Sequence, residues 1–248
     1  MANWSDPRTT AAPYATAAGT REGVYDAGLR SYMLSVYNYM TSGVLLTGIV
    51  ALLFSWGGVE SPAYTLIASG GPIAWLIMLS PLAIVFAMSF GQGRMSTGTL
   101  QLLYWAFTVL MGLSLSTIFL RYTGGSIASA FFATSAGFAG LSLWGYTTKK
   151  DLSAFGTFLI VGLVGLIVAS IINIFVQSGP LNLIISIAGV LIFAGLTAYD
   201  TQKIKSIYFQ VAGTEWQGKA AIMGALNLYL DFINMFLFIL RLFGSSRD

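Results

Sequence analysis

An acidic residue stands near the middle of a long apolar segment close to the C-terminus. Asp231 lies within residues 220–243, which read AAIMGALNLYLDFINMFLFILRLF. On a helix, Asn227, Asp231 and Asn234 share one side because they are spaced four and three residues apart, and Arg241 continues this polar stripe. Inserting Asp into a bilayer costs about 2.5–3.5 kcal/mol, so we expect the stripe to face a protein interior or a water-filled path.

A second carboxylate follows the preceding apolar segment. Residues 181–199 carry a small and polar face that includes Thr197 and ends at Asp200. Lys203 and Lys205 come directly after it, so an interfacial carboxylate beside lysines that reach the membrane surface is the alternative interpretation. Because the two segments are consecutive and antiparallel, we expect their polar faces to meet. The carboxylates would be offset by on the order of 10 Å unless the first helix extends further or tilts.

Two carboxylates held together in a low-dielectric bundle cannot both ionise cheaply, so they would share a proton. The shared proton would hold the two helices together. Its loss would leave two like charges that push the helices apart or draw in a cation, which makes a gate. Calcium prefers roughly six to eight oxygen ligands. Two carboxylates with the amides of Asn227 and Asn234 supply too few for a storage site, so the pattern favours a transient, water-completed site suited to conduction.

The composition indicates an integral membrane protein. The 248 residues are 56% hydrophobic and only 8% charged, against about 25% charged in soluble domains. The chain has no cysteine and no histidine, which excludes disulfides, thiol catalysis and metal sites built from these residues. No basic cluster indicates nucleic-acid binding. No lysine lies at mid-depth of an apolar segment, which excludes a retinal Schiff base.

Seven apolar segments have about the 20 residues needed to span a bilayer. They are residues 35–56, 72–90, 99–120, 126–146, 154–176, 181–199 and 220–243. We therefore predict an all-α integral membrane domain of seven transmembrane helices over residues 31–248, with the seventh helix central. Weakly polar residues such as Ser170 and Asn173 favour close helix packing over a pore lining.

Residues 1–30 differ from the remainder of the chain. They are rich in Ala, Thr, Gly and Pro without an apolar period, which predicts a disordered cytoplasmic tail and no signal peptide. With this tail inside, nine basic residues lie on the cytoplasmic side and three on the other, which predicts a cytoplasmic N-terminus. The nine are Arg8, Arg21, Arg30, Arg94, Lys149, Lys150, Lys203, Lys205 and Lys219, and the three are Arg121, Arg241 and Arg247.

Two segments resemble the signatures of a known family. AGLTAYDTQKIK (194–205) and LNLYLDFINMFLFILRLFG (226–244) resemble the two signature segments of the Bax inhibitor-1 family. GLSLSTIF (112–119) and the turn GYTTKKDLS (145–153) are similar to its bacterial members as well. The resemblance covers essentially everything after the tail, and LYLDFIN is its most specific part.

The resemblance implies a monomeric bundle whose seventh helix is surrounded by the other six. It also implies a pH-sensitive calcium leak across a bacterial inner membrane, gated by Asp200 and Asp231. Related proteins have a basic segment near the helix 2–3 junction, where an arginine can bond to the aspartate pair, and Arg94 in GQGRMS is the matching residue. The predicted site comprises the gate, pH sensor and transient cation site Asp200 and Asp231, the supporting stripe Asn227, Asn234, Arg241 and Thr197, and the latching base Arg94.

Three function classes follow from these residues. The first is a cation leak channel that passes calcium and responds to protons, with no resident cofactor and no enzymatic activity. The second is a regulator or partner of a membrane-anchored quality-control protease, which would require residues 1–30. The third is a proton-coupled carrier that uses the same aspartates as a relay. A hydrolase is disfavoured because the chain lacks His, Cys and a GxSxG-type nucleophile elbow.

Overall fold

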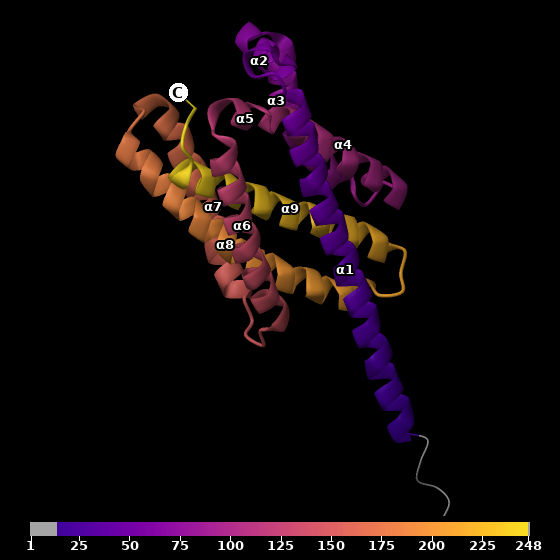
Figure 1. Cartoon of the computed structure of the whole chain (residues 1–248). Helices are drawn as coiled ribbons and strands as arrows, with labels where there is room; N and C mark the ends of the chain where they lie inside the picture. The colour runs from indigo at the N-terminus through magenta and orange to yellow at the C-terminus, as the bar shows by residue number, and fades with distance from the viewer. Residues whose placement is uncertain (1–13, 248) are drawn as a thin grey trace, which may run out of the picture.

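The computed structural model describes residues 14–247, and this part of the chain is helical without a β-strand (Figure 1). In chain order the elements are α1 (Tyr14–Phe54), the short 3₁₀ helix η1 (Gly58–Glu60), α2 (Pro62–Ser69), α3 (Pro72–Gly91), α4 (Thr97–Leu115), α5 (Thr117–Arg121), α6 (Gly124–Thr147), α7 (Ser153–Val176), α8 (Gly179–Val211) and α9 (Trp216–Phe243).

Seven helical stretches within residues 14–247 are long and apolar enough to cross a membrane. They are Ala27–Phe54, Pro72–Gly91, Thr97–Arg121, Gly124–Thr147, Ser153–Val176, Gly179–Val211 and Trp216–Phe243. The predicted seven-span, all-α fold is therefore confirmed. Helices suit this environment because each backbone N–H and C=O inside hydrocarbon must find its partner within the protein.

The third span is interrupted where the sequence predicts one continuous helix. α4 ends at Leu115 and α5 begins at Thr117, with Ser116 between them. The Ser116 hydroxyl donates to the carbonyl oxygen of Leu113 at 2.6 Å, and the Ser116 N–H bonds the same oxygen at 3.4 Å. A serine that bonds back to the preceding turn tightens and bends a helix, which accounts for the break.

α8 extends well beyond the predicted end at residue 199. The stretch after Asp200 lacks glycine and proline, so nothing in it ends the helix. Ile204 and Tyr208, one turn apart, are both buried, so this extension packs against the bundle. The longer α8 places Asp200 within the helix instead of at its end.

α1 begins at Tyr14, so the predicted disordered tail is helical in the part that the structure describes. The alanines, Arg21 and Glu22 of this stretch favour a helix, and no proline separates them from the membrane span that follows. Helix propagation from an existing span is easier than nucleation, which explains the difference. The prediction for residues 1–13 lies outside the described residues.

α9 is the central helix of the bundle. In its most apolar stretch 61% of the residues are buried, against 39% or less in each of the other spans. Its main neighbours are α1, α4, α6 and α8, while α3 packs against α4 and α7 packs against α8. The central position is therefore confirmed, but four spans, not six, form the main surroundings of α9. α3 and α7 are peripheral spans.

Hydrogen bonds and small residues join α9 to its neighbours. The hydroxyl of Thr47 on α1 donates to the Thr108 carbonyl oxygen on α4 at 2.8 Å, so it accepts the proton of Tyr229 on α9 at 2.7 Å. α6 and α8 are also in close contact, because a Cβ at Gly145 would collide with the backbone of Ala198. These contacts fix the position of α8 and α9, which carry the two aspartates.

Candidate functional site

Asp200 and Asp231 meet across the interface between α8 and α9. The two helices lie side by side (Figure 1), and the two carboxyl groups lie within hydrogen-bonding contact of each other. Asp231 is only 4% exposed, whereas Asp200 is partly buried. The axial offset considered from the sequence does not separate the two groups, because α8 continues past its predicted end.

One oxygen of this pair is buried without a partner. Oδ2 of Asp231 accepts no hydrogen bond from any residue in the described range 14–247. Buried polar atoms are nearly always hydrogen-bonded, and a carboxylate in apolar surroundings is costly unless it is protonated or paired with a cation. The geometry therefore allows this oxygen to hold a proton or to contact a cation.

A cavity of about 570 Å³ opens beside the pair between α7, α8 and α9. Its polar lining consists of Ser170, Asp200, Lys203, Asn227, Asp231 and Asn234, and the remaining lining is mostly apolar. The Asn234 amide donates to the carbonyl oxygen of Leu230 at 2.8 Å, which leaves its own oxygen free to accept. The predicted aspartates and both asparagines thus lie around one space.

The other predicted residues lie elsewhere. Thr197 is buried, and its hydroxyl donates to the carbonyl oxygen of Phe193 on the same helix at 2.8 Å. Arg241 lines two other cavities, at the end of α9. Arg94 is exposed in the turn between α3 and α4, where its N–H bonds the Gly91 carbonyl oxygen at 2.9 Å. None of the three lines the cavity that contains the aspartates.

Two of these six polar cavity residues, Lys203 and Ser170, are not among the site residues that the sequence predicts. Lys203 lies one turn after Asp200 and therefore on the same helix face, a spacing that could have indicated it. Its Nζ also lies 5.8 Å from the centre of the Tyr199 ring. The sequence predicts a packing role for Ser170, and its place in the cavity depends on how α7 packs against α8, which no local pattern reveals.

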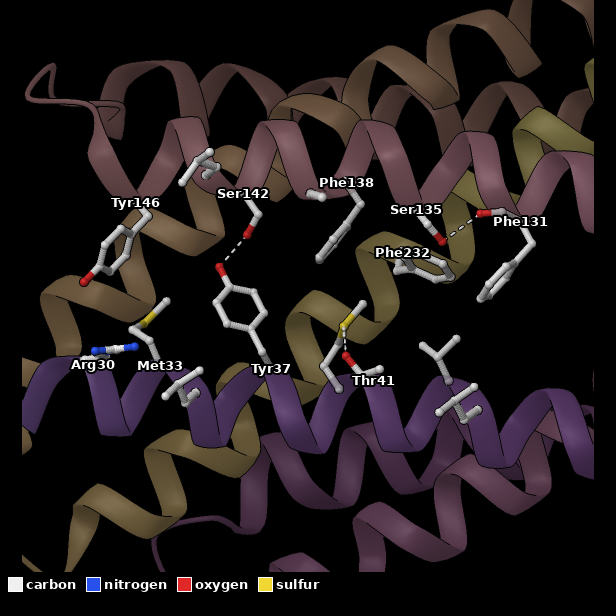
Figure 2. Close-up of a pocket in the computed structure, with 16 residues that line it drawn as sticks. Arg30, Met33, Tyr37, Thr41, Phe131, Ser135, Phe138, Ser142, Tyr146 and Phe232 are labelled. Carbon is white, nitrogen blue, oxygen red and sulfur yellow. Dashed lines mark hydrogen bonds between the residues drawn. The ribbon is translucent and has the colours of Figure 1, made fainter.

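A chain of hydroxyl groups links α1 and α6 to the turn of α8 that carries Asp200. Thr201 donates to the Thr197 carbonyl oxygen at 2.7 Å, so Ser142 must donate to Thr201, at 2.9 Å, and Tyr37 to Ser142, at 2.5 Å. Figure 2 shows Tyr37 and Ser142 reaching toward each other across a cavity of about 670 Å³ between α1 and α6. Neither aspartate lines this second cavity.

Comparison with known proteins places these features in a family. A sequence model described as inhibitor of apoptosis-promoting Bax1 matches residues 29–248. The chain is 45% identical to an uncharacterized protein of Rickettsia prowazekii, over 92% of this chain and 95% of the relative. It is 42% identical to the inner membrane protein YbhL of Escherichia coli, over 89% of this chain and 94% of the relative.

A less similar relative matches this chain over a comparable length. The chain is 35% identical to an uncharacterized membrane protein of Streptococcus pyogenes, over 89% of this chain and 95% of the relative. The family model covers both aspartate-bearing helices in full, and it covers the seven spans except for the first two residues of the first one. This multi-pass membrane protein belongs to the Bax inhibitor-1 family.

Proposed function

We propose that the protein is a pH-sensitive leak channel for cations, with calcium as the conducted ion. The observation that carries this proposal is the contact between Asp200 and Asp231, where a buried carboxylate oxygen without a partner lies beside a cavity that several polar side chains line. A packing role alone does not call for two carboxyl groups in contact, since apolar residues of similar volume are often as stabilising.

The gate works through one shared proton. When the proton is present, it bridges the carboxyl groups and holds α8 against α9. When the proton leaves, the two carboxylates repel each other. Separation of the helices or entry of a cation relieves this repulsion. Calcium would be held by the carboxylates, the amide oxygens of Asn227 and Asn234, and water. Such weak binding permits release and therefore conduction.

A path from the gate toward one end of the bundle supports this mechanism. The cavity beside the aspartates and a neighbouring cavity of about 430 Å³ share Ser170, Ile174 and Phe238 as lining residues. The second cavity is also lined by Asn173 and Asn182, so polar groups continue along the path. With a cytoplasmic N-terminus, as the charge distribution indicates, this path leads away from the cytoplasm.

A second candidate function rests on α1. Its N-terminal part extends away from the rest of the bundle (Figure 1), as expected of an arm that contacts another protein. A membrane-anchored quality-control protease is the partner that we propose for it. A proton-coupled carrier would use the same aspartates as the channel, but its flux would saturate with substrate and move protons in fixed proportion.

Calcium uptake into proteoliposomes that contain the purified protein, measured between about pH 6 and 8, tests the channel. We expect uptake in the wild type to rise with pH, and Asp200→Asn and Asp231→Asn each to flatten that dependence. Asp151→Asn is the matched control, because this carboxylate lies in the α6–α7 loop, where hydrogen bonds from Ser153 lower its pKa. Wild-type uptake equal to that of empty vesicles at every pH would exclude the channel.

A further inference from the structure

Two arginines from different elements line the same two cavities at one end of the bundle. Arg121 is the last residue of α5, and Arg241 lies in the last turn of α9. Both residues line the cavity of about 430 Å³ and a further one of about 460 Å³. Figure 1 shows α5 and the end of α9 close to the C-terminus, and the N–H of Arg247 bonds the Arg121 carbonyl oxygen at 2.8 Å.

Neither arginine at this end is paired with an acidic side chain in the described part of the chain. Neither cavity is lined by an acidic residue, and neither guanidinium forms an ion pair within residues 14–247. Instead, the Arg121 Cζ lies 5.8 Å from the centre of the Tyr122 ring, and the Arg241 Cζ lies 5.3 Å from the centre of the Phe238 ring. The helix dipole places only about half a negative charge at the C-terminal end of α9, which does not balance two arginines. An anion here would therefore be stabilised.

The 430 Å³ cavity adds hydrogen-bond donors to the two guanidinium groups. Asn173 uses its side-chain oxygen to accept the N–H of Ser178 at 3.1 Å, which leaves its amide N–H groups free. The side chain of Asn182, on the first turn of α8, forms no hydrogen bond within the described residues. A set of guanidinium and amide donors without a carboxylate suits a phosphate oxyanion, which arginine binds through two parallel hydrogen bonds.

The 460 Å³ cavity is different, because its lining away from the arginines is mainly apolar. Ile118, Leu120, Leu237 and Leu240 line it together with Tyr64 and Tyr122. An apolar lining of this kind would not stabilise a bound phosphate ion. A phospholipid would gain from both cavities, since its phosphate would contact the arginines while its acyl chains lie against the leucines. The site also lies at the ends of membrane spans, where lipid headgroups are found.

We propose that Arg121 and Arg241 bind the phosphate of an anionic phospholipid from the surrounding bilayer. Asn173 and Asn182 donate further hydrogen bonds to the headgroup, and the leucine-lined cavity holds part of an acyl chain. This phospholipid would bind whether or not the protein conducts ions. It does bear on the proposed path, because a bound phosphate neutralises positive charge at the end through which calcium would pass.

Native mass spectrometry of the purified full chain in neutral detergent, titrated with phosphatidylglycerol, tests this site. We expect one saturable lipid on the wild type. Arg121→Gln with Arg241→Gln should weaken this binding about tenfold or more, which corresponds to about 1.4 kcal/mol. Arg94→Gln is the matched control, because it removes an exposed arginine that lines neither cavity, and it should bind as the wild type does.

Two further measurements identify the ligand and guard against misfolding. Inorganic phosphate and phosphatidylcholine should compete poorly, because the first lacks acyl chains and the second lacks net charge. If the double variant does not fold, Arg241→Gln alone should bind the phospholipid several-fold more weakly. Arg241→Lys should have an intermediate affinity, because lysine keeps the positive charge but cannot form two parallel hydrogen bonds to the phosphate. Equal binding by the wild type and the folded variants, or displacement by inorganic phosphate at equal concentration, would overturn the proposal.

Discussion

The carboxyl groups of Asp200 and Asp231 are in contact between α8 and α9, and the buried Oδ2 of Asp231 has no hydrogen-bond partner within residues 14–247. Most buried polar atoms find a partner, so this oxygen is left able to hold a proton or to contact a cation, as the proposed gate requires. The surrounding helices hold the pair in place, while the cavity on the α7 side gives it access to water-sized and ion-sized species.

The shared proton predicts a specific infrared signature. In the wild type, a carbonyl stretch of a protonated carboxylic acid should titrate in two steps, because the steps belong to the coupled pair and not to either residue. Asp200→Asn should leave a single step, since only Asp231 then titrates. Unchanged two-step behaviour in Asp200→Asn would mean that the signal comes from other carboxyl groups. Asp151→Asn controls for an exposed carboxylate.

Gly145 is predicted to be essential for the contact between α6 and α8. Gly145→Ala places a Cβ against the backbone of Ala198, which must shift, and overpacking of this kind costs about 1–3 kcal/mol. The melting temperature in detergent should therefore fall. Gly140→Ala on the same helix is the matched control, because a Cβ there meets open space and should leave the melting temperature unchanged or slightly raised. Equal effects of the two substitutions would contradict the close packing of α6 against α8 at Gly145.

The hydroxyl chain from Tyr37 through Ser142 to Thr201 should contribute measurably to stability. Tyr37→Phe and Ser142→Ala should each cost about 0.5–1.5 kcal/mol, and the double variant should cost less than their sum because both remove the same hydrogen bond. Tyr39→Phe is the control, since the Tyr39 hydroxyl forms no hydrogen bond within the described residues. Full additivity in this double-mutant cycle would show that the two side chains are not coupled.

The two candidate functions differ in whether they need the N-terminal arm, residues 1–26. Removal of residues 1–26 leaves all seven spans intact, because the first begins at Ala27. If the protein is a channel, calcium uptake by the truncated protein should be retained. If the arm binds a protease, co-purification of that protease with the truncated protein should be lost. Loss of uptake in a truncated protein with an unchanged melting temperature would show that the arm takes part in conduction.

Much of the site could be predicted from the sequence because it lies on two helices with strong local patterns. The spacing of Asn227, Asp231 and Asn234 on one helix face does not depend on tertiary structure. The burial of a charge in an apolar segment requires a partner, and Asp200 on the preceding helix is the nearest available one. The seven spans were predictable because hydrophobic length is fixed by the bilayer.

The remainder depends on packing that short patterns do not record. Ser170 lines the cavity because α7 packs against α8, and Arg121 and Arg241 line the same cavities although they come from helices far apart in the sequence. The break at Ser116 results from one side-chain hydrogen bond, which a continuous apolar pattern conceals. Arg94, expected to latch the aspartates, lies exposed in a turn and outside their cavity, so its proposed role would require a different arrangement of α3 and α4.

The distance between spin labels on α8 and α9 shows whether one shared proton holds these two helices together. The chain has no cysteine, so Leu183→Cys and Phe243→Cys can be labelled without further changes. Both positions are exposed, one near the start of α8 and one at the end of α9. The protein would be reconstituted in bilayers and measured at about pH 6 and pH 8.

We predict that the distance between the labels increases from the acidic to the alkaline condition in the wild type. The same change of pH should leave the distance unaltered in Asp200→Asn, where a single carboxylate has no like charge to repel it. A wild-type distance that does not change with pH, or an equal change in Asp200→Asn, would contradict the gate.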